Sequence, residues 1–319
     1  MVSVSRRPAR LLVAAVAVLA AAVGVPVALA LLSEEPVLAT RLDELIPAAD
    51  SSGSGRASYL TYARNSAANR KHFDVYLRTT RDGTTKTRKL NADGTTGWGG
   101  GIDAPLVAYQ QVANGNSNVK LYDIGTRDRS TPAGVNTGEW EWHPTISGDW
   151  ILFARRKYSA PKSDEVLLVN RVTGDERTLA SSTYIGLAAG EVNGNWAVFD
   201  RCITLCNVFL YDITTQTTTR LERPAPDGDD PAEQYSPSVT PDGVVYLIRS
   251  IRTCDDGSSI VRYFGPGDPS TGTVVASVAA GRYVHTTFAR ANGDGTTDVF
   301  YDRFSCRTDK GDLYKVDDP

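Results

Sequence analysis

From Ser58 onward, the hydrophobic positions of the chain show no helical periodicity. Short runs rich in Val, Tyr, Phe, Leu and Thr alternate with clusters of Gly, Asp, Asn and Pro. Runs of this composition, bounded by turn residues, are typical of β-strands. The pattern therefore predicts an all-β structure that continues to the end of the sequence.

One strand pattern recurs along this region. The run Ile151–Arg155 matches Leu60–Arg64, Ala197–Arg201 and Val299–Arg303, each with an aromatic residue in third place and arginine in fifth. Two further runs complete a column of six aromatic residues separated by 44 to 55 positions: Tyr62, Tyr109, Phe153, Phe199, Tyr246 and Tyr301. Repeats of this length are typical of β-propeller blades, each built from four strands.

Other features keep the same register. A turn containing Gly, Asn or Asp precedes the aromatic strand, as in Ser147–Trp150 and Thr240–Gly243. Such residues supply the backbone freedom that a tight strand-to-strand turn requires. A third strand follows and, in several repeats, a polar fourth strand such as Glu176–Leu179. We therefore predict a six-bladed β-propeller with four-stranded blades.

The sixth repeat lacks a fourth strand, because only five residues follow Tyr314. Near the N-terminus, Thr40–Leu42 matches Thr219–Leu221, the fourth strand of another repeat. A strand donated from the N-terminus would close the ring and remove two open sheet edges. We predict that residues 38–45 form this strand within a linker of residues 31–57, and that residues 58–319 form the propeller.

The first thirty residues have the character of a targeting segment. Three arginines precede an unbroken run of small and apolar residues from Leu11 to Leu32, which is typical of a signal peptide or a membrane anchor. Pro26 and the small residues at Ala28 and Ala30 favour a signal peptide cleaved after Ala30 over a retained anchor. Both interpretations place the rest of the chain outside the cytoplasm, secreted or held at the outer face of the membrane through residues 11–32.

Charge excludes some classes of partner. The chain has 34 basic and 37 acidic residues, and residues 1–30 contain three of the basic and none of the acidic ones. The mature chain would therefore carry a net charge of −6 instead of −3. An acidic exterior disfavours binding to nucleic acid or to anionic lipid.

The repeat resembles that of the TolB-like family of six-bladed propellers. The run Ser236–Tyr246, with its Ser-Pro and Pro-Asp-Gly elements, is the best match, and Leu210–Asp212 and Leu121–Asp123 match the family's Tyr-Asp strand. The resemblance covers roughly residues 38–319 and implies an extracytoplasmic scaffold for protein partners. The family's extra N-terminal domain is not expected, because too few residues separate the apolar run from the first blade.

Four cysteines fall in the predicted loops between second and third strands: Cys202, Cys206, Cys254 and Cys306. A zinc site would favour paired Cys-x-x-Cys motifs with nearby histidines, and the spacing does not match. Disulfides persist in exported proteins, and four cysteines allow three pairings. We favour Cys202–Cys206 within one loop and Cys254–Cys306 between neighbouring blades, with metal binding and free thiols as alternatives.

Other charged clusters favour structural roles. Asp227–Glu233 and Asn292–Gly295 could bind calcium, but Arg290 stands at the first-ligand position of the second segment, and charged runs with Gly and Pro are usually solvated loops. We expect no metal and no cofactor, with calcium as the alternative. One repeat column contains the arginines Arg64, Arg155, Arg201 and Arg303, beside Asp200 and Asp302 in the preceding column. We favour structural pairing with these aspartates and with neighbouring blades over a ring that binds anions.

Aromatic residues gather where the innermost strand of each predicted blade begins: Trp98, Trp140, Trp142, Tyr184, Tyr235 and Tyr283. In a propeller these positions surround one mouth of the central channel. Because Trp and Tyr combine apolar area with a polar group, they suit a surface that binds a protein or peptide. The alternative is that they only pack between blades.

Support for catalysis is thin. The sequence lacks the Gly-x-Ser-x-Gly motif of a nucleophile elbow. Asp103, Glu191 and Asn193 could in principle bind a metal in the channel, but they belong to only two blades. We therefore predict an exported, non-catalytic propeller that acts as a protein-binding or scaffold module of the cell envelope. The alternatives are a metal-dependent propeller enzyme acting on a carbohydrate or lactone, and a structural envelope protein.

Overall fold

The computed structural model describes residues 34–38, 44–51, 57–65, 71–183, 186–203, 205–221, 233–250, 254, 257–264, 268–308 and 310–319. These residues belong to one compact unit, Leu31–Pro319. The predicted targeting segment, residues 1–30, lies outside the described part, as does the Thr-Arg-Leu match at residues 40–42. The described residues contain no apolar helix of membrane-spanning length.

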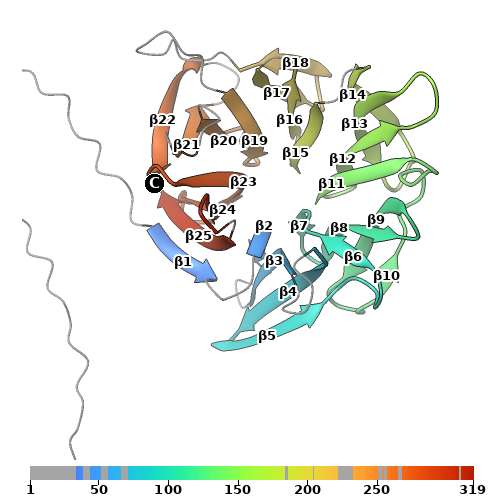
Figure 1. The fold of residues 1–319 in the computed structure, drawn as a ribbon, viewed down its shortest axis with the longest axis horizontal. Coiled ribbons are helices and arrows are strands. Elements are labelled where there is room, and N and C mark those ends of the chain that lie inside the picture. Colours follow the sequence, from blue (N-terminus) through green and yellow to red (C-terminus); the bar gives the residue numbers. More distant parts are fainter. Residues whose placement is uncertain are drawn as a thin grey trace, which may run out of the picture. The chain divides into compact units, whose positions relative to one another are not determined.

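The described strands form six antiparallel sheets arranged as blades around a central channel, which confirms the predicted six-bladed β-propeller (Figure 1). Their bounds are as follows. Blade 1 contains β2 (Glu44–Ser51), β3 (Ala57–Asn65), β4 (Phe73–Arg81) and β5 (Thr84–Lys89); blade 2 contains β6 (Thr96–Trp98), β7 (Ile102–Asp103), β8 (Leu106–Ala113), β9 (Asn116–Asp123) and β10 (Arg129–Ser130); blade 3 contains β11 (Trp140–Ser147), β12 (Trp150–Lys157), β13 (Ser163–Asn170) and β14 (Glu176–Ser182).

The remaining three blades complete the ring. Blade 4 contains β15 (Leu187–Asn193), β16 (Trp196–Cys202), β17 (Cys206–Asp212) and β18 (Thr217–Arg220); blade 5 contains β19 (Glu233–Val239), β20 (Val245–Ser250), β21 (Ser258–Phe264) and β22 (Asp268–Val278); blade 6 contains β23 (Arg282–Ala291), β24 (Thr297–Ser305), β25 (Lys310–Asp318) and, at its outer edge, β1 (Glu34–Leu38). In blade 2, β6 and β7 both pair with β8 and together form the innermost strand, and β7 lies nearest the channel; in each other blade the strand named first is innermost (Figure 1).

An N-terminal strand completes the last blade, but it is not the predicted segment. β1 pairs with β25 so that Pro36 lies opposite Tyr314 and Leu38 opposite Leu313. The closing strand is therefore residues 34–38 and not 38–45, and residues 44–51 instead form the innermost strand of blade 1. The sequence concealed this inner strand because Pro47 interrupts it, and proline in a strand is tolerated only at edges or bulges.

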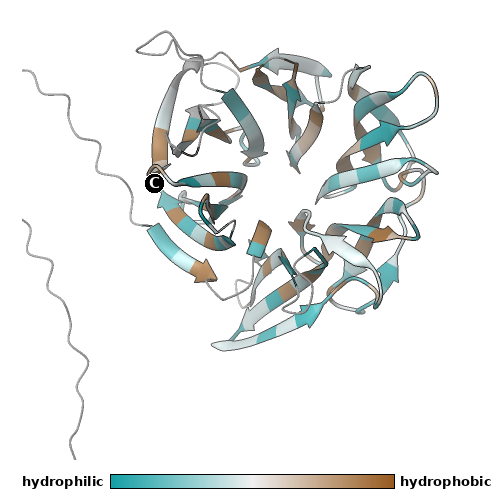
Figure 2. Ribbon diagram, in the orientation of Figure 1, coloured by the Kyte–Doolittle hydropathy of each residue, from teal (hydrophilic) through white to brown (hydrophobic). Residues whose placement is uncertain are grey.

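Hydrophobic packing lies between the blades. All six members of the aromatic column are at most 2% exposed, and each of the six buried clusters joins neighbouring blades. The blades thus bury apolar residues against one another. The outermost strand of blade 1, β5, is largely hydrophilic in Figure 2, and all but the last of its residues are exposed. Buried tyrosines also need hydrogen-bond partners, and Tyr246 donates to Asp318 at 2.7 Å.

A bulge interrupts the innermost strand of most blades. It falls at Ile46-Pro47 in β2, His143-Pro144 in β11 and Ser236-Pro237 in β19, and the residue before each proline has a φ near +50°. In blade 4, Gly190 lies in the bulge of β15, where an added Cβ would come within 2.4 Å of the Pro237 carbonyl oxygen. Backbone therefore approaches backbone around the channel, and glycine is required where the contact is tightest.

Both predicted disulfides are present. Cys202–Cys206 joins β16 to β17 across their hairpin, and Cys254–Cys306 joins the corresponding regions of blades 5 and 6. Neither free thiols nor a zinc site therefore involves these four residues.

Candidate functional site

The bulges leave little space in the middle of the channel. The cavity there has a volume of about 70 Å³ and is lined by bulge residues that include Ile46, Gly100, His143, Gly190 and Ser236. A volume of this size holds a few water molecules and excludes a substrate of ordinary size. Any larger ligand must therefore remain at a mouth of the channel.

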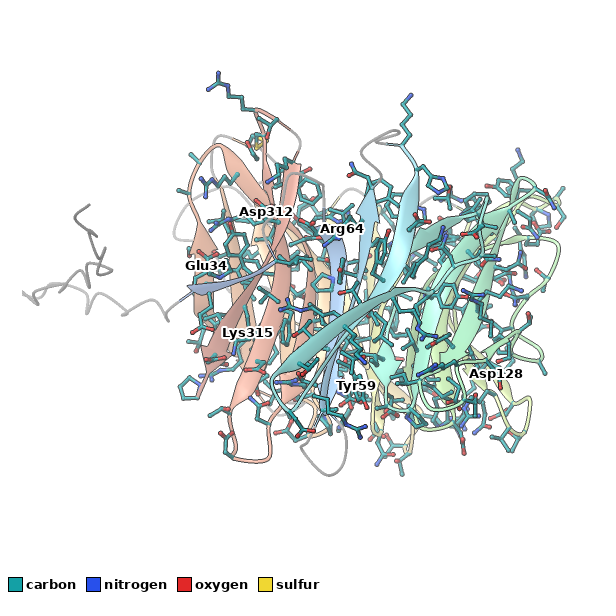
Figure 3. All side chains as sticks on the ribbon, turned by 90° about the horizontal axis from the view of Figure 1, so that it is seen from below. Glu34, Tyr59, Arg64, Asp128, Asp312 and Lys315 are labelled. Carbon is teal, nitrogen blue, oxygen red and sulfur yellow. A yellow bond between two sulfur atoms is a disulfide. The ribbon has the colours of Figure 1, made fainter. Side chains whose placement is uncertain are left out.

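A larger hollow opens at the mouth where the innermost strands begin. We call it the mouth hollow; it has a volume of about 510 Å³ and is lined by Asp200, Cys202, Cys206, Glu233, Tyr235, Ser236, Ser250, Cys254, Tyr283 and His285. These residues come from blades 4, 5 and 6, and both disulfides contribute to the lining. Figure 3 places Arg64, which pairs with the first residue of β2, at this end of the propeller and Tyr59 at the opposite end.

Beside the mouth hollow, Asp302 joins the last blade to the first. Its fully buried carboxylate accepts hydrogen bonds from the backbone N–H groups of Ile46 at 3.1 Å, His285 at 3.0 Å and Thr286 at 2.7 Å, and from the Thr286 hydroxyl at 2.8 Å. Burial raises the pKa of Asp302, but the hydrogen bond and charge of His285, with the backbone donors, outweigh it and hold the pKa below its usual range. The Asp302 carboxylate thus accepts hydrogen bonds from backbone N–H groups in the innermost strands of blades 1 and 6.

Asp200 occupies the same repeat position in blade 4 but has fewer donors. Its carboxylate accepts from the Ser236 N–H of blade 5 at 2.9 Å and from the Ala188 backbone. The side chain is buried and lies near Glu233, so burial, assisted by the charge of Glu233, raises the pKa of Asp200 to about 7. A carboxyl group with this pKa carries only part of its charge at neutral pH.

Two histidines near the channel have pKa values shifted in opposite directions: His285 lines the mouth hollow and His143 lines the small cavity between the bulges. Burial lowers the pKa of His285, but its hydrogen bond and ion pair with Asp302, at 3.5 Å, outweigh burial and raise the pKa above the usual value. Burial, with a smaller contribution from the charge of His285, lowers the pKa of His143 to about 4. At neutral pH the bulge of β11 therefore contains a neutral imidazole, while His285 carries more positive charge than an isolated histidine.

The predicted aromatic residues do not form one continuous rim. Tyr235 and Tyr283 both line the mouth hollow, and Tyr235 donates to the Val284 carbonyl oxygen at 3.3 Å. Trp98 stacks on Phe73 at 4.4 Å, and together with Tyr283 it packs on the buried cluster between blades 1 and 6. Their role in binding stays a prediction, since each ring is also partly engaged in packing.

The other predicted aromatic residues lie apart from the mouth hollow. Trp142 packs on the cluster between blades 3 and 4, with the guanidinium group of Arg156 5.2 Å from its ring centre. Trp140, on the same strand, is opposite Arg156 in the sheet. Tyr184 lies outside the described residues.

Most of the predicted arginine column pairs with glutamate. Arg64 contacts Glu44 at 3.0 Å and Arg155 contacts Glu141 at 3.2 Å, and both glutamates are fully buried. Arg303 contacts Glu34 of the closing strand at 2.7 Å, so this ion pair adds to ring closure. Arg201, by contrast, is exposed on its blade. A structural role therefore holds for three members of this column, but their partners are glutamates and not the adjacent aspartates that we favoured.

The three groups considered as metal ligands on inner strands do not converge. Asp103 accepts from the Gly148 N–H of the next blade, while Glu191 accepts from the Val239 N–H and Asn193 donates to the Val239 carbonyl oxygen, both at 3.1 Å. These side chains therefore connect neighbouring inner strands. The described residues contain no group of three or more His, Cys, Asp or Glu side chains placed to share a metal ion.

Of the two calcium candidates, the segment Asn292–Gly295 with Asp298 lies within the described residues. Asp294 accepts from the backbone and hydroxyl of Thr296, and Asp298 pairs with Arg290 and Lys315. Its carboxylates therefore serve the turn and the adjacent strands. In the acidic segment only Glu233 is described, at the start of β19 in the mouth hollow.

Sequence reasoning did not identify Asp200, Glu233 and His285 as members of one site. The signal available was the repeat column that contains Asp200 and Asp302, together with the Ser-Pro element at Ser236-Pro237. These features show where a blade meets its neighbour at the channel. They do not show which residues from separate blades share a hollow.

No protein-family model matches the chain, and no curated protein sequence is significantly similar to it. The fold is shared with TolB from Acinetobacter baumannii (TM-score 0.53, 13% identity, 81% of this chain and 63% of that protein). It is also shared with an oligogalacturonate lyase from Vibrio parahaemolyticus (TM-score 0.52, 11% identity, 88% and 81% of the two chains). An acylaminoacyl peptidase from Pyrococcus horikoshii matches with a TM-score of 0.50 at 10% identity, over 86% of this chain and 44% of that one.

The chain thus spans less than two thirds of that TolB and under half of the peptidase. Identities this low establish a common propeller fold. Because the fold occurs in TolB and in enzymes alike, it does not by itself assign an activity.

Proposed function

We propose that this chain is an exported, non-catalytic β-propeller that binds a protein partner of the cell envelope at the mouth hollow. The observation that carries the proposal is the combination of an open mouth hollow of about 510 Å³ with a cavity of only about 70 Å³ between the bulges. A partner segment can enter the mouth but cannot pass the bulges. A hollow of this size that opens at the surface can accept a loop or a chain terminus of another protein.

The lining supports recognition of a polypeptide. Tyr235 and Tyr283 offer aromatic surface with a hydroxyl group at its edge, a combination common at the centres of protein interfaces. Glu233 and Asp200 add acidic groups beside these rings. The inserted segment is therefore expected to be apolar with one basic side chain or a terminal amino group, because a cation would relieve the repulsion between the two carboxyls.

The location rests on three observations. Two disulfides stabilise loops around the mouth hollow, and disulfides persist in oxidising compartments. The N-terminal apolar run with its basic flank has the pattern of an export signal. The fold is also that of TolB. N-terminal sequencing of the native protein should give a mature chain that begins at Leu31.

Photo-cross-linking in living cells tests the binding site. We would replace Tyr283 with a photoreactive phenylalanine analogue and, as a matched control, replace Tyr158, which is 53% exposed in a loop of blade 3 outside the mouth hollow. A protein adduct at position 283 that is absent at position 158, and that weakens in a Glu233→Gln background, is the expected result. Equal adducts at both positions, or none at position 283, would contradict the proposal.

A further inference from the structure

A second concave surface lies between the first two blades, away from the channel. We call it the blade 1–2 groove; it has a volume of about 840 Å³. One wall is formed by β3, β4 and β5, and the other by Ala104-Pro105 and the segment Tyr122–Arg127 of blade 2. Figure 3 shows Tyr59, which lines this groove, at the end of the propeller opposite Arg64. The groove and the mouth hollow are therefore separate sites.

The first wall is one continuous sheet face. Strand pairing places Tyr59 opposite Thr79, and Thr79 opposite Lys86. On one side of this pair Arg81 lies opposite Thr84, and on the other side Leu77 lies opposite Arg88. Because side chains alternate between the two faces of a strand, residues two apart on β4 and β5 project into the same groove.

The floor of the groove is apolar and its rim is basic. Leu77 and Tyr122 are 4% and 3% exposed, whereas Arg81, Lys86 and Arg127 are exposed. None of these three cations has an ion-pair partner among the described residues, and Arg88 donates to the Tyr122 hydroxyl at 3.2 Å. Asp82 is the only acidic residue that lines the groove, so four cations face one carboxylate.

The positive charge of the groove contrasts with the net negative charge of the chain. The whole chain has a net charge of −3, and most basic side chains with a structural role are paired, as Lys89 is with Asp74 at 3.0 Å. Unpaired cations gathered along a groove produce a local positive potential that attracts anionic ligands. A surface placed only for solubility would not need this one-sided arrangement.

We propose that the blade 1–2 groove binds a linear anionic polysaccharide. The four cations come from β4, β5 and the blade 2 turn, so they can pair with several carboxylate or sulfate groups of one chain. The hydroxyl groups of Thr79 and Thr84 add hydrogen-bonding partners for sugar hydroxyls. A concave groove is unfavourable for a flat lipid surface. Tyr122 is 3% exposed, too deeply placed to stack with a base, so the groove lacks the row of exposed aromatic rings that a single-strand binder uses.

Binding to defined polymers tests this proposal. Full-length mature protein would be titrated with polygalacturonate, dextran sulfate and neutral dextran at 50 mM and 300 mM NaCl. We expect binding to the two anionic polymers at the lower salt concentration, clear weakening at the higher one because exposed ion pairs are screened, and no binding to dextran.

The variants separate the groove from general charge. Combined Arg81→Gln, Lys86→Gln and Arg127→Gln substitutions should weaken binding about tenfold or more, with an unchanged melting temperature. The control combines Lys162→Gln, Arg201→Gln and Arg307→Gln, three exposed cations on other blades, and should bind like the wild type.

Several outcomes would overturn the proposal. They are the absence of binding to either anionic polymer, equal losses in the two triple variants, and tighter groove-dependent binding to oligo(dT) or to phosphatidylglycerol vesicles. The protein-partner proposal stands or falls separately, because the groove variants should leave the cross-link at position 283 intact.

Discussion

Replacing Asp302 with asparagine would test whether a buried carboxylate holds the ring closed. Besides its contact with the His285 imidazole, Asp302 accepts three hydrogen bonds from backbone N–H groups and one from a hydroxyl group. One of the backbone donors is Ile46 of blade 1, so Asp302 connects the blades at which the ring begins and ends. Hydrogen bonds to a charged group contribute about 1.5–3 kcal/mol each, and buried donors left without an acceptor are costly. Asparagine keeps one acceptor oxygen but adds an N–H₂ group that faces backbone donors.

We therefore expect Asp302→Asn to lower the free energy of unfolding by about 3 kcal/mol. For a protein of this size, that corresponds to a fall in melting temperature of about 5 °C. The pKa of Asp302 is held below its usual range, so its contribution should be present above the usual carboxyl range and be lost as pH falls through the lowered pKa. Thermal unfolding followed by circular dichroism from pH 3 to pH 8 measures both quantities.

Asp200→Asn is the matched control, because Asp200 holds the same repeat position with fewer donors. Its pKa is raised to about 7, so the folded state binds a proton that the unfolded state has released between about pH 4 and pH 7. The wild type should therefore lose stability over this interval, by up to about 4 kcal/mol, and Asp200→Asn should not. If Asp200→Asn is as damaging as Asp302→Asn at pH 8, donor number does not set the contribution of these carboxylates.

Three further changes test the packing and closure of the ring. Gly190→Ala should lower the free energy of unfolding by about 1–3 kcal/mol, because the added Cβ would meet the neighbouring bulge backbone. Gly138→Ala, where an added Cβ has nothing within 4 Å, should change stability little, and equal melting temperatures for the two variants would contradict this explanation. Replacing both Cys254 and Cys306 with alanine should lower the free energy of unfolding by about 4 kcal/mol, and replacing both Cys202 and Cys206 should lower it by about 2 kcal/mol. The difference arises because the two disulfides close loops of 52 and 4 residues, and urea unfolding that ranks the variants in the opposite order would refute the estimate. Removing the residues up to and including β1 should cost a few kcal/mol by exposing the edge of β25, and an unchanged urea midpoint would show that β1 does not close the ring.

The fold and the cysteine pairing could be read from local patterns. An aromatic residue every 44 to 55 positions, with turns at fixed offsets, marks the second strand of each blade, because a strand buried on both faces needs such residues. Cys202 and Cys206 are near enough in sequence to meet across one hairpin, and repeat register places Cys254 and Cys306 in equivalent loops of adjacent blades. Each of these inferences requires only strand order.

The first blade shows where local patterns were insufficient. Pro47 hid the inner strand β2, because a sequence does not reveal that the proline sits in a bulge where no ladder hydrogen bond is lost. As a result, the closing strand was placed too late in the chain. Its observed position depends on pairing with β25, a partner more than 270 residues away.

The architecture, the number of blades, the two disulfides and the acidic character of the chain all follow from patterns along the sequence. Nothing in those patterns shows that Asp200, Glu233 and His285 share the mouth hollow or that Arg81 and Arg127 flank the blade 1–2 groove. A repeat pattern sets which residues occupy equivalent places within a blade, but a site between blades depends on how each sheet is twisted and packed against the next, and that follows from the contacts of the whole ring.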